Sequence, residues 1–145
     1  MRRAWPVFFL ALLPLACNRA TGPAVVTGPA SAPGWEVRYN ASIALARRGN
    51  PHAIEASAKD SLLEMLDEEQ QMRNFREKVN GKEISNVAGA QLTVITAVQA
   101  IAELHRRQPD LDLSFFKPAI DKLTNSLSVA VSTEAKKTQQ LLAIK

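Results

Sequence analysis

The sequence has little cysteine, few aromatic residues and no strong excess of one charge. Only one of its 145 residues is cysteine and 6% are aromatic, while 18 Lys and Arg stand against 14 Asp and Glu. A single cysteine, Cys17, excludes an intramolecular disulfide and a Cys-rich metal cluster. With 46% apolar residues the chain is too hydrophobic to be wholly disordered. Its length suits one domain with or without tails.

The apolar run near the start of the chain is too short to cross a membrane. Arg2 and Arg3 precede apolar residues 5–16, whereas a spanning helix needs about 20 residues. This layout is typical of a secretory signal peptide, which we predict over residues 1–16. Removing Arg2 and Arg3 leaves 16 basic residues against 14 acidic ones, a net charge of +2. Such a small charge on an exported chain argues against nucleic-acid binding.

The lone cysteine follows a short motif with a known counterpart. The residues before Cys17 are Leu13, Pro14, Leu15 and Ala16. They resemble the lipobox of bacterial lipoproteins, although Pro14 stands where that family usually has leucine. The resemblance implies that the leader is removed before Cys17 and that this cysteine is lipidated, which would anchor the protein to a membrane of the cell envelope. The alternative is an ordinary secretory leader that ends in a chance cysteine.

Residues 17–34 are rich in proline, glycine and alanine. Such a segment buries too little apolar surface to offset its chain entropy. We therefore predict a disordered tether, which reaches at most about 50 Å at ~3.1 Å per residue. Its role would be to hold a folded domain, residues 35–145, clear of the lipid headgroups.

From Trp35 onward the apolar residues have helical spacing, and no run alternates with the period of two that is typical of strands. Glycine and proline turns separate the helical segments. We therefore predict an all-α domain. The six expected helices span residues 36–48, 51–66, 68–79, 85–108, 113–126 and 129–144.

Two of these helices share an internal pattern of small residues. Residues 41–46 and 97–102 both read Ala-x-x-Ala-aliphatic-Ala, and a weaker third copy contains Val131 and Ala135. Small side chains let neighbouring helices approach closely, so we expect these faces to stack. The polar residues 68–81 are interpreted as an insertion between repeats. The expected inward face of the first helix comprises Val37, Ala41, Ala44, Leu45 and Arg48, with Tyr39, Ile43 and Ala46 beside them. That of the long helix comprises Ala88, Leu92, Ile95, Val98, Ala102 and His105 or Leu104.

The first copy continues through the turn Gly49-Asn50-Pro51 into the apolar residues 62–66. This arrangement resembles the HEAT family of α-helical repeats. The resemblance implies a short α-solenoid of about two to two and a half antiparallel helix pairs that serves as a binding surface. The second copy, residues 94–123, lacks the aspartate and glycine turn of that family. A solenoid would stack the first helices of its pairs in parallel, whereas a closed bundle would alternate their directions.

The chain carries no familiar motif for catalysis, metal binding or cofactor binding. It has no HExxH, no G-x-S-x-G and no phosphate-binding glycine loop. A metal site would need His52 and His105 together with Glu55 or Asp110, and their spacing does not demand one. We interpret both histidines as surface or capping residues. We therefore expect neither an enzyme nor a cofactor.

Two arginine pairs follow the alanine patterns. Arg47 and Arg48 close the first helix, and Arg106 and Arg107 close the long helix. Stacking of the repeats would bring four guanidinium groups to one edge, where they could face an acidic partner or anionic lipid. The alternative is ordinary stabilisation of helix C-termini by basic side chains.

Together these features predict a membrane-tethered, non-catalytic interaction or scaffold module of the cell envelope. An unidentified protein or peptide would bind the face made by the second helix of each pair, within residues 54–66 and 114–126. With so few repeats the module is near the lower limit for a continuous core, so self-association is also expected as an option. The alternative is a helical-bundle lipoprotein that acts as a spacer without a binding groove. A periplasmic enzyme accessory is a third possibility.

Overall fold

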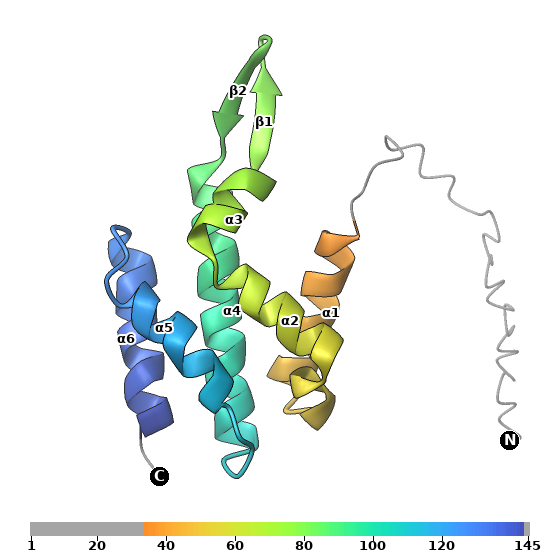
Figure 1. The fold of residues 1–145 in the computed structure, drawn as a ribbon, viewed down its shortest axis with the longest axis vertical. Helices are drawn as coiled ribbons and strands as arrows, with labels where there is room; N and C mark the ends of the chain where they lie inside the picture. Colours follow the sequence, from red (N-terminus) through yellow and green to blue (C-terminus); the bar gives the residue numbers. More distant parts are fainter. Residues whose placement is uncertain (1–33, 144–145) are drawn as a thin grey trace, which may run out of the picture. The chain divides into compact units, whose positions relative to one another are not determined.

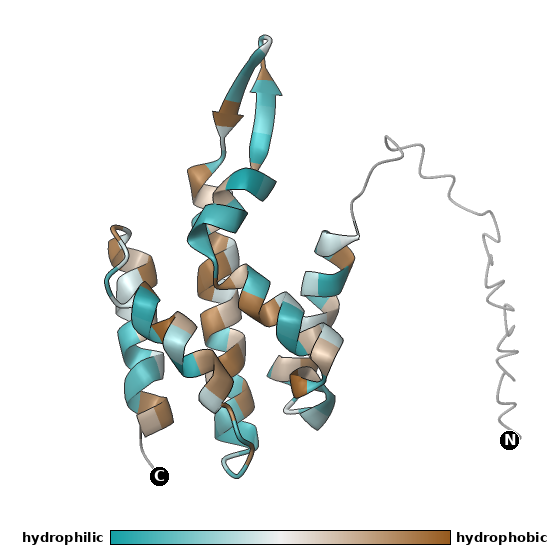
Figure 2. Ribbon diagram, in the orientation of Figure 1, coloured by the Kyte–Doolittle hydropathy of each residue, from teal (hydrophilic) through white to brown (hydrophobic). Residues whose placement is uncertain are grey.

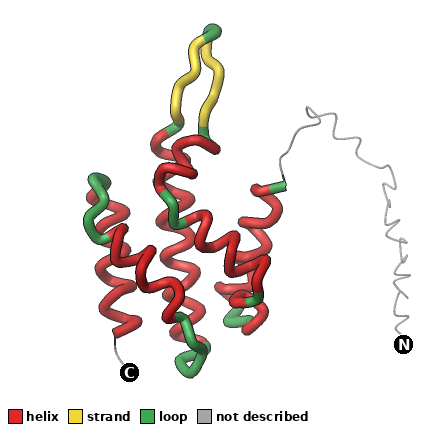
Figure 3. The backbone as a smooth tube through the Cα atoms, in the orientation of Figure 1, coloured by secondary structure: helices red, strands yellow, loops and turns green. Residues whose placement is uncertain are grey.

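The computed structural model describes residues 34–143, where the chain is mostly helical, as expected, with one small β-hairpin (Figures 1 and 3). All of these residues belong to one unit, Ser31–Lys145. Short 3₁₀ turns, Pro51–Ile54 and Ser114–Phe116, precede the second and fifth helices. The elements are α1 (Trp35–Arg47), α2 (Ala56–Met65), α3 (Glu68–Asn74), β1 (Arg76–Val79), β2 (Lys82–Ser85), α4 (Val87–Arg107), α5 (Lys117–Leu123) and α6 (Val129–Ala143).

The long helix α4 lies between α1 and α6 and also contacts α3. Helix α2 packs against α1, and α5 packs against α6. Figure 1 shows that α1, α4 and α6 run in the same direction, while α2 and α5 run back and form a second layer. The hairpin extends away from the helices beyond the end of α3 (Figure 3).

Polar side chains fix where α3 and α4 begin. Asp67 Oδ1 accepts hydrogen bonds from the backbone N–H groups of Glu69 and Gln70, at 3.0 and 3.2 Å. Asn86 Oδ1 accepts one from the N–H of Gly89 at 2.9 Å. Because the first N–H groups of a helix have no partner within the helix, such caps determine its starting residue.

Helix α4 supplies much of the hydrophobic core. Nine of its 21 residues are buried, and the helix contacts α1, α2, α3 and α6. By length and composition α4 could also cross a membrane. In this structure its buried side chains instead form part of the core of the domain. The largest fully buried apolar residues of the described chain are Phe116, Leu62, Met65, Ile101, Leu104, Ile120, Leu123, Val94, Val98 and Val131.

The connection between α3 and α4 is a β-hairpin. Its strands are antiparallel, with Arg76 opposite Ser85 and Val79 opposite Lys82. The expectation that no strand follows Trp35 is therefore wrong. Most hairpin side chains are exposed and charged, so the apolar alternation that marks a half-buried strand is missing.

The turn of the hairpin explains why Asn80 and Gly81 were interpreted as the end of a helix. Asn80 and Gly81 both have positive φ, at 53° and 78°. A two-residue type I′ turn requires positive φ at both central positions, which makes Asn-Gly a strong hairpin signal. The helix break expected at this pair is thus the turn between two strands, and the helix predicted over residues 68–79 instead ends at Asn74.

The buried face of α1 is not the one that the spacing predicts. Tyr39, Ser42 and Ala46 are buried. Apolar residues occur on both sides of α1, so spacing alone does not decide which side faces the core. Contacts with distant residues decide it: Trp35 meets the ring of Phe75, and Tyr39 accepts hydrogen bonds from α3. The members of the predicted inward face that are exposed are Val37, Ala41, Ala44 and Arg48.

The alanine patterns of α1 and α4 consequently do not match in burial. Ala97 and Ala100 are fully buried, whereas their counterparts Ala41 and Ala44 are exposed. Only the third alanine, Ala46 in α1 and its counterpart in α4, is buried in both. Of the inward face predicted for α4, Val98 and Ala102 are buried, Ile95 is half-buried, and Ala88 and Leu92 are exposed.

Two further predicted helices are shorter than expected. The segment 51–66 divides at Glu55, whose extended backbone (ψ 152°) separates a 3₁₀ turn from α2. The segment 113–126 contains a second 3₁₀ turn and the seven-residue helix α5. The boundaries of α1, α4 and α6 lie within two residues of those predicted.

Candidate functional site

A groove of about 500 Å³ lies beside α3 and α4, near the base of the hairpin. We call it the α3–α4 groove. Its walls come from α3, from the first two turns of α4 and from the connection between α5 and α6. The lining residues are Glu68, Glu69, Met72, Arg73, Arg76, Val87, Ala90, Gln91, Val94, Leu127 and Ser128.

Apolar side chains form the floor and part of the rim of this groove. Leu127 is fully exposed, and Val87 is 47% exposed. Val129, two residues after Leu127, is 79% exposed. Figure 2 shows hydrophobic residues at the start of α4 and at the α5–α6 connection. Large aliphatic side chains that gather on a surface at one end of a domain are typical of an interaction site.

Charged side chains of both signs follow α3 along the rim. Glu68 and Glu69 lie in its first turn and Arg73 in its last, with Arg76 just beyond. Ser126 Oγ donates a hydrogen bond to Glu68 Oε1 at 2.6 Å, which ties the α5–α6 connection to α3 across 58 residues of sequence. The groove thus has an acidic end and a basic end.

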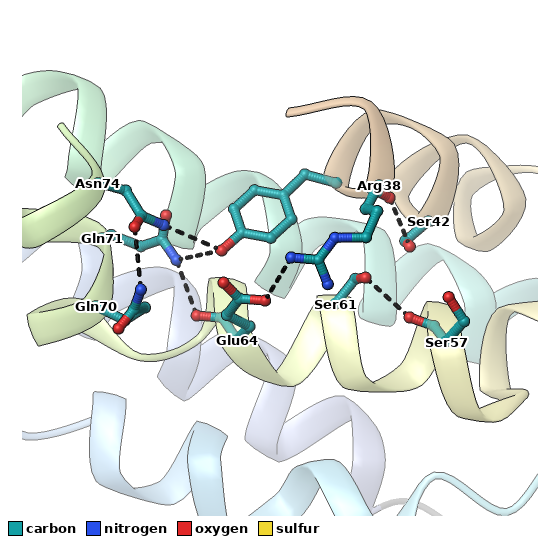
Figure 4. A network of polar contacts seen from close by, with 9 residues as sticks. Arg38, Ser42, Ser57, Ser61, Glu64, Gln70, Gln71 and Asn74 are labelled. Carbon is teal, nitrogen blue, oxygen red and sulfur yellow. Dashed lines mark hydrogen bonds and ion pairs between the residues drawn. The ribbon is translucent and has the colours of Figure 1, made fainter. Parts of the chain in front are cut away.

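A buried polar network holds α3 in place. Tyr39 Oη accepts hydrogen bonds from Gln71 Nε2 at 3.1 Å and from Asn74 Nδ2 at 3.3 Å. Gln71 Nε2 also donates to the backbone carbonyl of Glu64 at 2.8 Å. Figure 4 shows Arg38, whose guanidinium lies 3.3 Å from the Glu64 carboxylate, in the same network. These contacts connect α1, α2 and α3.

The two arginine pairs lie at the C-terminal ends of α1 and α4, and all four side chains are exposed. These two helix ends touch, because a Cβ on Gly49 would lie 2.6 Å from the Cβ of Arg107. Glu103 Oε1 accepts from Arg107 at 2.6 Å, and Glu103 Oε2 accepts from Arg106 at 2.8 Å. These hydrogen bonds, chiefly the one from Arg107, lower the pKa of Glu103.

The two pairs therefore differ in their surroundings. Within residues 34–143, Arg47 and Arg48 make no ion pair, whereas Arg106 and Arg107 share one carboxylate. The positive charge that no nearby carboxylate balances therefore lies mainly at the end of α1.

The remaining candidate residues are dispersed. His52 Nδ1 contacts Glu55 Oε1 at the surface. His105 is buried, which contradicts its interpretation as a surface residue and agrees with the alternative that it faces inward, as Leu104 also does. Its Nδ1 finds no hydrogen-bond partner in the described part of the chain. Across residues 34–143, no group of three His, Cys, Asp or Glu side chains could hold a metal ion. Cys17 and the residues of the predicted signal peptide and tether, up to residue 33, lie outside the described residues.

Sequence reasoning missed the α3–α4 groove. It placed the binding face on the second helices, and it treated the residues of α3 as part of an insertion. One usable signal was Leu127, an isolated large apolar residue between two serines in a predicted break between helices. The other wall could not be predicted, since it depends on the hydrogen bonds of Tyr39.

No protein-family model, curated protein or solved structure matches this chain. The geometry of the described residues is therefore the basis on which a function can be proposed.

Burial raises the pKa of Tyr39 to about 12, and the nearby Glu64 carboxylate adds to this effect. Tyr39 is the only tyrosine of the chain, so an ultraviolet absorbance titration reports this group alone. We expect a midpoint near 12 in the folded protein and about 10 in denaturant. Because the unfolded chain releases its proton first, the free energy of unfolding should be constant below pH ~10 and fall as pH rises towards 12. Equal midpoints in both states would show that the phenol is not buried in the network.

Proposed function

We propose that this protein is a membrane-tethered, non-catalytic interaction module of the cell envelope, which binds a peptide or protein segment in the α3–α4 groove. The observation that carries the proposal is the exposed aliphatic pair Leu127 and Val87 at the rim of an apolar groove. Burial of one such side chain in a complex contributes about 1.5–3 kcal/mol.

The charges on α3 favour one kind of ligand. Glu68 and Glu69 lie at one end of the groove, and Arg73 and Arg76 lie at the other. A short amphipathic helix with an acidic first turn and a basic last turn would match them, provided that it runs antiparallel to α3. Such a segment would supply aliphatic anchors spaced by three or four residues.

We further propose that the domain is a short HEAT-like solenoid. The parallel directions of α1, α4 and α6 and the return of α2 and α5 support this proposal. Helix α3 and the hairpin would then be an insertion between the first two repeats, and the insertion would supply one wall of the groove. Because the alanine patterns of α1 and α4 differ in burial, the proposed repeats resemble each other only in the order and direction of their helices.

The membrane tether is also a proposal. It is supported by the lipobox-like residues before Cys17 and by the Pro- and Gly-rich composition of residues 17–34. A lipid anchor would keep the groove close to a membrane, where the exposed Arg47 and Arg48 could meet anionic lipid or an acidic partner.

A Leu127→Ser substitution should weaken ligand binding at the groove. Selection from a library of displayed linear peptides against the chain should enrich sequences with spaced aliphatic residues. We expect these peptides to bind Leu127→Ser about 10- to 100-fold more weakly, which corresponds to the loss of one buried leucine. Val37→Ser, at an exposed position distant from the groove lining, is the matched control. Enriched peptides that bind Leu127→Ser as tightly as the unchanged chain, or an absence of enrichment, would refute the groove and favour a simple spacer.

Cys17→Ala should release the protein from the membrane fraction. If this cysteine carries the acyl chains, the variant loses incorporation of radiolabelled palmitate and moves to the soluble fraction, because the tether alone offers little apolar surface to lipid. Asn18→Ala serves as the control and should remain in the membrane fraction. Equal palmitate incorporation in the Cys17→Ala variant would remove the lipid anchor.

A further inference from the structure

The turn of the β-hairpin places an asparagine directly before a glycine at the surface. Asn80 and Gly81 are both exposed, and nothing lies within 4 Å of the position that a Cβ on Gly81 would take. Within residues 34–143, neither the side-chain amide of Asn80 nor the backbone N–H of Gly81 forms a hydrogen bond. The strands pair through the flanking residues, Val79 and Lys82. The amide and the N–H group are therefore free and open to water.

An asparagine in this setting can react with its own backbone, and asparagine is one of the chemically labile residues of proteins. The nitrogen of Gly81 loses its proton, attacks Cγ of Asn80 and closes a cyclic succinimide. The bond from Cγ to the side-chain nitrogen breaks, and ammonia leaves with the proton that Gly81 lost. Water then opens the ring, and the Gly81 nitrogen regains a proton. Opening at the side-chain carbonyl gives aspartate, whereas opening at the main-chain carbonyl gives isoaspartate.

The other asparagines of the described chain lack this arrangement. The N–H groups that follow Asn74 and Asn125 donate to backbone carbonyls, at 3.0 and 3.1 Å. Asn50 precedes a proline, which has no N–H. The side chain of Asn86 accepts from a backbone N–H and donates to a carboxylate. Asn40 lies within α1, where helical hydrogen bonds occupy the backbone N–H groups.

The hairpin holds its turn only weakly. All but one of its strand residues are exposed, and Val79 and Ile84 are 44% and 51% exposed, so strand pairing buries little apolar surface. The ion pair between Arg76 and Glu83 spans 3.8 Å, and both side chains are exposed. A hairpin of two strands is marginally stable in water. Transient opening of the turn, which lets the Asn80 side chain reach the Gly81 nitrogen, therefore costs little free energy.

We propose that Asn80 is a site of spontaneous covalent modification, at which its side chain closes onto Gly81 and is converted to isoaspartate, and that this conversion opens the hairpin. A type I′ turn accepts asparagine or aspartate before glycine, so the aspartate product leaves the hairpin intact. Isoaspartate adds an extra carbon to the backbone of the turn, so Val79 and Lys82 no longer lie opposite each other. The reaction needs only water, so copies of the protein lose the hairpin as they age.

The change should remain confined to the hairpin. At its base the N–H of Asn86 donates to the carbonyl of Phe75 at 2.7 Å, and the Asn86 side chain caps α4. Neither contact involves the turn. We therefore expect α3 and α4 to keep their positions, and the modification does not require the proposed ligand of the α3–α4 groove.

Peptide mapping of the full chain after incubation at mildly alkaline pH tests the modification. A Glu-specific protease releases residues 78–83, and electron-transfer fragmentation of this peptide separates isoaspartate from aspartate. We expect Asn80 to convert about tenfold or more faster than Asn125, which corresponds to a barrier lower by about 1.4 kcal/mol. The rate should rise with hydroxide concentration, because the attacking nitrogen must lose its proton. Asn125 is the internal control, since it is exposed like Asn80 but precedes an N–H that is already bonded.

An Asn80 that stays unchanged in the folded chain, under conditions that convert it in denaturant, would overturn the proposal, because the turn would then protect the pair. Equal conversion at Asn80 and Asn125 would overturn it as well.

Hydrogen–deuterium exchange tests the effect on the hairpin. After incubation the amides of β1 and β2 should lose protection in proportion to the isoaspartate content, while those of α6 stay the same. Asn80→Gly keeps a residue that accepts positive φ but has no side-chain amide, so its strands should stay protected through the same incubation. Protected strands in chains that carry isoaspartate, or strands that open equally in incubated Asn80→Gly, would contradict the opening of the hairpin.

Discussion

The hydroxyl group of Tyr39 fixes the position of α3. It accepts hydrogen bonds from Gln71 and Asn74, which lie one turn apart on α3, while Gln71 also binds the carbonyl of Glu64 at the end of α2. Tyr39 is only 3% exposed, so water cannot readily replace a lost partner. A seven-residue helix is not stable by itself in water. The network therefore determines where α3 lies, and with it one wall of the groove and the base of the hairpin.

Helix α4 supplies the opposite wall and separates the surfaces of the described domain. Its first turns line the α3–α4 groove, whereas its last turn carries Arg106 and Arg107 close to the end of α1. The bond between Ser126 and Glu68 joins the α5–α6 connection to α3. The α3–α4 groove and the two arginine pairs thus lie at opposite ends of α4.

Local signals in the sequence predict the helices better than they predict the surfaces. The turn at Gly49 and the polar residues around Pro109 predict the C-terminal ends of α1 and α4 accurately. Turns and helix-ending residues act within a few positions of the chain, so they can be recognised locally. Burial faces depend on long-range contacts: Tyr39 orients α1 through residues more than 30 positions away. The hairpin was missed because its strands are charged, although Asn80-Gly81 signalled it. The groove combines segments from residues 68 to 128, so no single pattern reveals it.

Hydrogen–deuterium exchange of the Tyr39→Phe variant tests the central claim, that one buried hydroxyl holds α3. Removing this acceptor leaves the Gln71 and Asn74 amides without their shared partner. Because a net hydrogen bond contributes about 1 kcal/mol, we expect the α3 amides to exchange roughly 5- to 30-fold faster than in the unchanged chain. Exchange in α6 should stay the same. Unchanged exchange in α3, or an equal increase throughout residues 35–143, would contradict the account.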